Sequence, residues 1–185
     1  LNAFTTEQFR LMSSSQIGAL GTDQVKTLTT EDLASISTAG IKGLTSAQLG
    51  AMTTDEVVAL GTQQVAALGS AQTAGLTTDQ VAKLESDDLR ALSTAALTKF
   101  SSDQFGALDS DQIASLTTAQ VASLATTPLN QFATMTTDEI RALTTAQAAA
   151  LTSSQVRGLS SDQLNAMETD DLRAINTAAV RNLST

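Results

Sequence analysis

The amino-acid sequence predicts an all-α solenoid, a superhelix of short helices with one helix of about five or six residues in each eight-residue repeat. Three observations predict this fold class. Large apolar residues recur at every eighth position, helix-capping residues follow each of them, and charges are sorted by sign within the repeats. A short fixed period of this kind is typical of proteins that stack one structural unit linearly.

The eight-residue unit, or octad, is defined by two apolar positions. Position 1 holds a large apolar residue from Phe4 to Leu124 and, after one slip, again from Met135 onward. Position 6 is also apolar, and only Thr73 and Ala148 depart from a large apolar residue there. Octads are numbered from Phe4, so octad 16 begins at Leu124 and octad 17 at Met135. The core residues expected in two representative pairs of octads are Leu20, Val25, Leu28 and Leu33, and Leu76, Val81, Leu84 and Leu89.

Neither a continuous helix nor a strand fits this spacing. In an unbroken helix, eight residues advance two turns plus roughly 80°, so the apolar stripe would wind around the helix and leave no face to bury. In a strand, positions 1 and 6 would lie on opposite faces. One short helix in each octad, followed by a turn, satisfies the pattern.

Capping residues indicate where each helix begins. Position 2 is mostly Thr, Ser, Gly, Asp or Asn, and position 5 is usually glutamine, as in Gln24 and Gln80. Together they form a capping box, and positions 1 and 6 form a hydrophobic staple. Position 3 is always Ser or Thr, as in Thr22 and Thr78, and we expect a partly buried hydroxyl that bonds the backbone of the neighbouring repeat. The alternative exchanges the roles of positions 2 and 3, but only the first assignment gives the staple.

Charge placement supports the same helix polarity. All nineteen acidic residues occupy positions 2, 4 or 5, and all ten basic residues occupy positions 7 or 8. Acids near a helix N-terminus and bases near its C-terminus complement the helix dipole. A helix this short is not stable alone, so neighbouring repeats must pack on one another.

The pattern predicts one solenoid with a single interruption. Residues 1–131 form sixteen octads from residue 4, residues 132–134 are a slip or kink, and residues 135–185 continue with six octads and a partial one. Pro128 falls in the first turn of its predicted helix, where a missing N–H is tolerated. Because the chain begins and ends in mid-pattern, we expect a segment of a longer array, whose partners are neighbouring repeats of the same longer chain.

A weaker, longer period is also present. The octad with Glu31 and Asp32 recurs 56 residues later as the octad with Asp87 and Asp88. Seven octads separate the two. This spacing reflects either duplication of a larger block or a superhelical repeat.

Composition excludes several classes of function. The chain has no His or Cys, and no residue pattern indicates a catalytic, cofactor-binding or metal site. A net charge of −9 argues against a nucleic-acid partner and against anionic membranes, and no apolar run could insert into a bilayer. Paired acids such as Asp87 and Asp88, or Asp170 and Asp171, could bind a hard cation. Their octad positions already explain them as charges at helix N-termini.

Units such as Leu-Thr-Thr-Asp-Gln-Val, found at residues 76–81, resemble the octad runs of very large bacterial secreted or cell-surface repeat proteins of the adhesin kind. The resemblance implies a stalk or spacer outside the cell. The same residues also resemble the helix opening of TAL-effector DNA-binding repeats, but the period of 8 and the negative charge mean that DNA binding does not carry over.

The sequence therefore predicts a non-enzymatic structural segment without cofactor, belonging to a larger bacterial surface or secreted protein. The alternative is a solenoid module that binds a protein, peptide or glycan.

Overall fold

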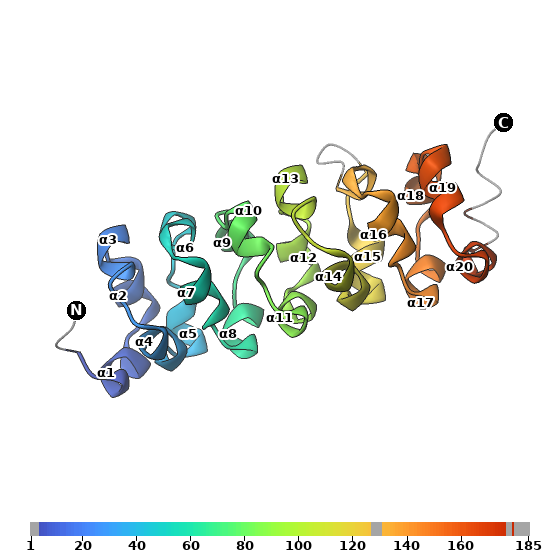
Figure 1. Ribbon diagram of the computed structural model, residues 1–185. Helices are drawn as coiled ribbons and strands as arrows, with labels where there is room; N and C mark the ends of the chain where they lie inside the picture. Colours follow the sequence, from blue (N-terminus) through green and yellow to red (C-terminus); the bar gives the residue numbers. More distant parts are fainter. Residues whose placement is uncertain (1–3, 127–130, 177–178, 180–185) are drawn as a thin grey trace. The chain divides into compact units, whose positions relative to one another are not determined.

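The structure is a computed structural model that describes residues 4–126, 131–176 and 179. Within these residues the chain is all-helical, with short helices joined by tight turns and no strands (Figure 1). The α-helices are four to six residues long. The predicted all-α solenoid of short helices is confirmed, with some helices one residue shorter than expected.

The chain divides into two compact units, which are described separately. Unit 1 is Leu1–Lys99 and unit 2 is Phe100–Thr185. In unit 1 the helices are α1 (Thr6–Leu11), α2 (Ser14–Gly18), α3 (Thr22–Val25), α4 (Thr30–Ser35), α5 (Thr38–Ile41), α6 (Ser46–Ala51), α7 (Thr54–Val58), α8 (Thr62–Ala66), α9 (Ser70–Thr73), α10 (Thr78–Val81), α11 (Ser86–Ala91) and α12 (Thr94–Leu97). Each of these helices belongs to one octad.

Unit 2 repeats the same pattern. Its elements are α13 (Ser102–Phe105), α14 (Ser110–Ser115), α15 (Thr118–Ser123), the 3-10 helix η1 (Phe132–Thr134), α16 (Thr137–Arg141), α17 (Thr145–Ala149), α18 (Ser153–Gly158), α19 (Ser161–Ala166) and α20 (Thr169–Ala174). Pro128 lies outside the described residues.

Each α-helix begins at position 3, with position 2 as its N-cap. In α10, the Thr77 hydroxyl accepts a hydrogen bond from the Gln80 backbone N–H at 3.2 Å, and Gln80 Oε1 accepts one from the Thr77 N–H at 2.8 Å. These two bonds are the reciprocal capping box, and they satisfy N–H groups that the helix itself cannot pair. Of the two alternatives, the structure therefore has the cap at position 2.

The partly buried position expected for the hydroxyls of Thr22 and Thr78 is wrong. Thr22 and Thr78 are the first helical residues and are exposed, because the first turn directs them away from the core. The amide of position 5, described below, makes the bonds to the backbone of neighbouring octads. Thr62 does act between turns, but its hydroxyl bonds the carboxyl of Asp88 rather than a backbone group.

Packing follows one rule in both units: a helix contacts the helix of the octad three places later. In unit 1, α1 packs on α4, α2 on α5 and α3 on α6, and the rule continues to α9 and α12 (Figure 1). In unit 2, α17 packs on α20 and α16 on α19. Positions 1 and 6 fill the interior between these turns, with Leu89, Val81 and Ile113 fully buried.

At the slip, Gln131 takes the role of position 5 in octad 16. Gln131 Oε1 accepts a bond from the Ala125 N–H at 3.2 Å, which is the bond that position 5 makes to position 2 in other octads. Phe132, buried at 1% exposure, follows it as the position-6 core residue and begins η1. Contact between η1 and α18 follows the same three-octad rule. Octad 16 is thus an enlarged octad of residues 124–134, and the stacking register passes through it.

Two glycine pairs allow close approach between turns of unit 1. A Cβ on Gly18 would lie 2.8 Å from the Gly43 carbonyl oxygen, and a Cβ on Gly50 would lie 2.6 Å from that of Gly75. A Cβ on Gly43 would overlap the backbone of Ser14. Each pair joins octads three places apart, so side chains larger than hydrogen would separate the turns. A Cβ on Gly158, by contrast, would have nothing within 4 Å.

We expect Gly43→Ala to lower the free energy of unfolding by about 1–3 kcal/mol, because the added methyl must push the α2 backbone away. Urea unfolding followed by circular dichroism measures this change. Gly158→Ala is the matched control and should be neutral or slightly stabilising, since alanine favours the helix. Equal effects of the two substitutions would contradict the close approach.

Candidate functional site

The most extensive polar arrangement in the structure is formed by the glutamine side chains of position 5. Gln80 illustrates it. Its Oε1 caps its own helix, while its Nε2 donates to the carbonyl oxygens of Leu49 at 2.9 Å and Met52 at 2.7 Å. Leu49 is position 6 of octad 6, and Met52 is position 1 of the following octad. The C-terminal carbonyls of a helix need such partners, so one amide serves the start of its own helix and the end of another.

The same pair of inter-turn hydrogen bonds recurs in both units. Each joins Nε2 to the position-6 carbonyl four octads earlier and to the next position-1 carbonyl, at 2.6–3.2 Å. Both bonds are made by Gln48, Gln64, Gln72, Gln80, Gln147 and Gln155. These side chains are buried, between 0% and 8% exposed. In this environment an unpaired amide would be destabilising, so the bonds fix the register between turns.

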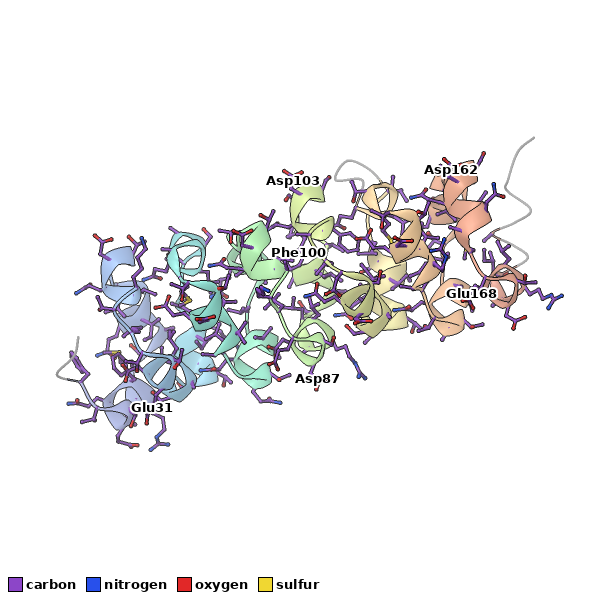
Figure 2. All side chains as sticks on the ribbon, in the orientation of Figure 1. Glu31, Asp87, Phe100, Asp103, Asp162 and Glu168 are labelled. Carbon is purple, nitrogen blue, oxygen red and sulfur yellow. The ribbon has the colours of Figure 1, made fainter. Side chains whose placement is uncertain are left out.

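This geometry sets the number of octads in a turn. A helix contacts the octad three places away, and its glutamine reaches the octad four places away, so a turn takes about three and a half octads. Seven octads, or 56 residues, then complete two turns. The 56-residue spacing between Glu31 and Asp87 therefore matches a superhelical repeat, and Figure 2 shows both side chains along the same edge of unit 1.

The core residues expected from the sequence lie where the octad pattern placed them. Seven of the eight are buried at 5% exposure or less, and Leu20, in the first turn, is half-buried. Gln80 is buried, but Gln24 is exposed. The exceptional Thr73 is fully buried, and its hydroxyl donates to the Ala96 carbonyl oxygen at 3.1 Å, which explains a polar residue at an apolar position.

Carboxyl groups replace the amide in several octads. Glu56, Asp88, Glu139 and Asp171 are buried at position 5. Glu56 retains the capping bond, since its Oε2 accepts from the Thr53 N–H at 2.6 Å, but an ionised carboxylate cannot donate to the carbonyls of the previous turn. Burial raises the pKa of Asp88 above its ordinary value of 3.8, although the bond from the Thr62 hydroxyl opposes this shift.

Charge is distributed unevenly over the surface of unit 1. At position 4, acids recur every 24 residues on the connected helices α1, α4, α7 and α10; these are Glu7, Glu31, Asp55 and Asp79, all exposed. Of the connected helices α3, α6, α9 and α12, only α3 carries an acid at this position, Asp23; the others carry the exposed alanines Ala47, Ala71 and Ala95. The helices of one three-octad series are thus acidic at position 4 throughout, whereas in the other series only α3 is.

Ion pairs in the described residues join position 4 to position 7 of one octad. They are Glu7–Arg10, Asp87–Arg90, Asp138–Arg141 and Asp170–Arg173, and all are largely exposed. The hydrogen bond from Arg10 lowers the pKa of Glu7. Exposed pairs of this kind contribute little to stability, so they do not hold the turns together.

The described residues bring no set of three potential metal ligands together. None of the described helices is long and apolar enough to cross a membrane. A shallow hollow at the start of unit 1 is lined by Phe4, Gln8, Leu11, Met12 and Gln16. The chemistry that this arrangement supports is hydrogen bonding between stacked turns.

Sequence reasoning assigned position 5 to the capping box alone and missed its bonds between turns. The signal was the preference for glutamine over glutamate, because a capping box accepts either residue. Only the amide carries N–H donors for the previous turn.

We expect Gln80→Glu to lower the free energy of unfolding by about 2–4 kcal/mol, because the carboxylate keeps the cap but loses both donated bonds. The matched control Gln24→Glu replaces an exposed amide and should change the free energy of unfolding little. The reverse substitution Glu56→Gln should be stabilising by about 1 kcal/mol. Chemical denaturation of the three variants at neutral pH measures these changes, and a neutral Gln80→Glu would contradict the role of the amide.

Asp88 should make stability depend on pH. Because its folded pKa is raised, the native state binds the proton more tightly than the unfolded chain between the unfolded and folded pKa values. The free energy of unfolding should therefore fall as pH rises through that window and stay lower above it. Asp88→Asn should raise the melting temperature at pH 7 and remove the part of the pH dependence that comes from Asp88. A variant that melts at the wild-type temperature across the pH range would contradict it.

Comparison with protein families identifies the repeat. The family described as the ALTTAQ repeat matches residues 1–30, 28–62, 57–84, 81–118, 129–161 and 164–185. A comparison with curated proteins gives no match. The family matches leave only residues 119–128 and 162–163 uncovered, and the eight-residue period and capping glutamines extend over the matched stretches. The chain therefore belongs to the ALTTAQ repeat family.

Proposed function

We propose that this chain is a non-enzymatic structural segment, a stalk, spacer or scaffold, of a larger bacterial secreted or cell-surface protein. The observation that carries the proposal is the repetition of one pair of inter-turn hydrogen bonds along both units. Most of the buried polar side chains are position-5 residues, the place where the amides link one turn to the next. Such a chain gains length by adding equivalent units.

The non-enzymatic role is supported by composition, since the chain carries no His or Cys that could act as a base, nucleophile or ligand near neutral pH. The bacterial surface role rests on the resemblance of its octads to runs in large surface repeat proteins. Antibodies raised against this chain should bind intact producing cells. Signal confined to lysed cells would contradict the surface role while leaving the spacer role untouched.

A spacer should lengthen by a fixed step when complete octads are added in the three-octad register of helix packing. The chain has no cysteine, so spin labels can be placed uniquely at Ala119→Cys and Asp170→Cys, two exposed sites on α15 and α20. Inserting a second copy of residues 143–166, three octads, after Ala166 should increase the label separation by about 8–10 Å, one helix-to-helix step. Double electron–electron resonance measures this distance.

The matched control inserts residues 143–162 only, which is not a multiple of eight. This insertion breaks the octad register and should reduce helicity and broaden the distance distribution. An in-register insertion that leaves the separation unchanged would contradict the spacer. Saturable binding of a peptide or glycan by the unaltered chain would instead favour the alternative, a ligand-binding solenoid.

A further inference from the structure

Two consecutive octads of unit 1 have no amide at position 5. Octads 11 and 12, residues 84–99, carry Asp88 and Ala96 at this position, and both side chains are buried. In the two octads before them, Gln72 and Gln80 each donate two hydrogen bonds to the preceding turn. By the same four-octad rule, the carbonyls that octads 11 and 12 would bond are those of Val57, Leu60, Val65 and Leu68. An ionised carboxylate or a methyl group cannot donate to them, so the amide links between turns are interrupted twice in succession.

The helices of these two octads also have incomplete caps. Gln72 and Gln80 each accept a bond from the N–H of their N-cap residue at 2.8 Å. In α11 the N-cap is Glu85, whose side chain makes no cap bond, and no capping box is formed. In α12 the Ser93 hydroxyl accepts from the Ala96 N–H at 3.1 Å, but alanine has no side-chain oxygen to accept the reciprocal bond. The residues at position 5 therefore leave both the helix starts and the links to the preceding turn weaker than in octads 9 and 10.

Two threonine hydroxyls bond octads 11 and 12 in place of the amides. Thr62 in α8 bonds the carboxyl of Asp88, and Thr73 in α9 donates to the Ala96 carbonyl oxygen at 3.1 Å. Each supplies one hydrogen bond, where a glutamine such as Gln80 supplies two. Burial raises the pKa of Asp88, so its charge is unfavourable in this position. Octads 11 and 12 are thus held to the preceding turn by fewer and less favourable polar contacts than octads 9 and 10.

The same combination of residues recurs along the chain. Asp32 and Gly40 occupy position 5 of octads 4 and 5, and Asp171 and Ala179 occupy position 5 of octads 21 and 22. In each case an acid is followed, eight residues later, by a residue whose side chain has no polar atom. The N-cap of α20, Glu168, also makes no side-chain cap bond. Interruption of the amide links is therefore a repeated feature of the array.

We propose that octads 11 and 12 form a joint at which unit 1 opens first, by separating from octads 7–9 while the earlier turns stay closed. In an array held by contacts between neighbouring units, local opening occurs where those contacts are weakest. The turns before the joint are held by the paired amide bonds of Gln48, Gln64, Gln72 and Gln80. The joint goes beyond the spacer role, because it gives the array a defined place at which it can extend and close again.

Thiol labelling under native conditions tests the joint, because the chain has no cysteine of its own. A buried thiol reacts only when local opening exposes it, so its labelling rate reports the opening equilibrium. Leu92→Cys reports on octad 12 and the matched variant Leu76→Cys on octad 10, since both leucines occupy position 1 and are 3% and 5% exposed. We expect Leu92→Cys to react at least tenfold faster, about the factor for a net loss of one or two hydrogen bonds. Urea unfolding of each variant gives the contribution of global unfolding, which is subtracted from each rate.

Supplying the missing amide should close the joint. In the Leu92→Cys background, Asp88→Gln should slow labelling about tenfold, because the new side chain can reach the preceding turn. Asp88→Asn removes the same charge but carries a shorter side chain, and should slow labelling less. Asp79→Gln makes the same exchange as Asp88→Gln at an exposed position and should leave the rate unchanged.

The joint should also be transferable. Gln72→Asp together with Gln80→Ala places the residues of octads 11 and 12 in octads 9 and 10, and should raise the labelling rate of Leu76→Cys at least to that of Leu92→Cys. Circular dichroism shows that this variant is folded. Equal rates for the two cysteine variants without further substitution would overturn the proposal, as would an Asp88→Gln effect no larger than that of Asp88→Asn. The spacer role stands apart from these results, because it rests on the amide links of the other octads.

Discussion

The structure depends on one constraint: a helix of four to six residues cannot satisfy its own ends. The first N–H groups and last carbonyls of a helix have no partner within it, and here they make up most of its backbone polar groups. The glutamine of position 5 resolves both ends, because a primary amide offers an acceptor and a donor pair on one rigid plane. Its oxygen accepts a hydrogen bond at the start of one helix, and its nitrogen donates to carbonyls at the end of another, as Gln80 does with Leu49 and Met52. Local capping and stacking between turns are therefore the same interaction.

This coupling explains how much of the fold could be predicted from the sequence. The N-cap at position 2, the buried positions 1 and 6, and the sorting of charges are local features, and each of them can be predicted from the octad pattern. The partner of the amide is not local, because the carbonyls of Ile17 and Leu20 are 31 and 28 residues from Gln48. The expected bond from the position-3 hydroxyl was placed on the wrong side chain for this reason. If the number of octads in a turn were known, the bond between turns could be assigned to the position-5 amide.

At the slip, octad positions counted by eight along the sequence differ from the positions that the residues take in the stacked structure. Counting by eights placed Gln131 at the end of octad 16 and Phe132 at the slip. In the structure Gln131 bonds the N–H of Ala125 and the carbonyl oxygen of Phe100, and Phe132 is buried as a core residue. The glutamine and its apolar neighbour therefore make the contacts of positions 5 and 6 in other octads. Stacking is thus specified by the Gln–apolar pair rather than by a strict count.

The equivalence of the octads has a consequence for how such an array evolves. Most octads offer the same donor at their start, and all offer backbone acceptors at their end, so loss or gain of an entire unit leaves each remaining amide facing carbonyls of the required kind. Recombination between misaligned copies of the coding sequence, which adds or removes multiples of 24 nucleotides, then yields chains that still fold. The length of the array is therefore inherited and can change in a single genetic step, without any substitution in the existing octads.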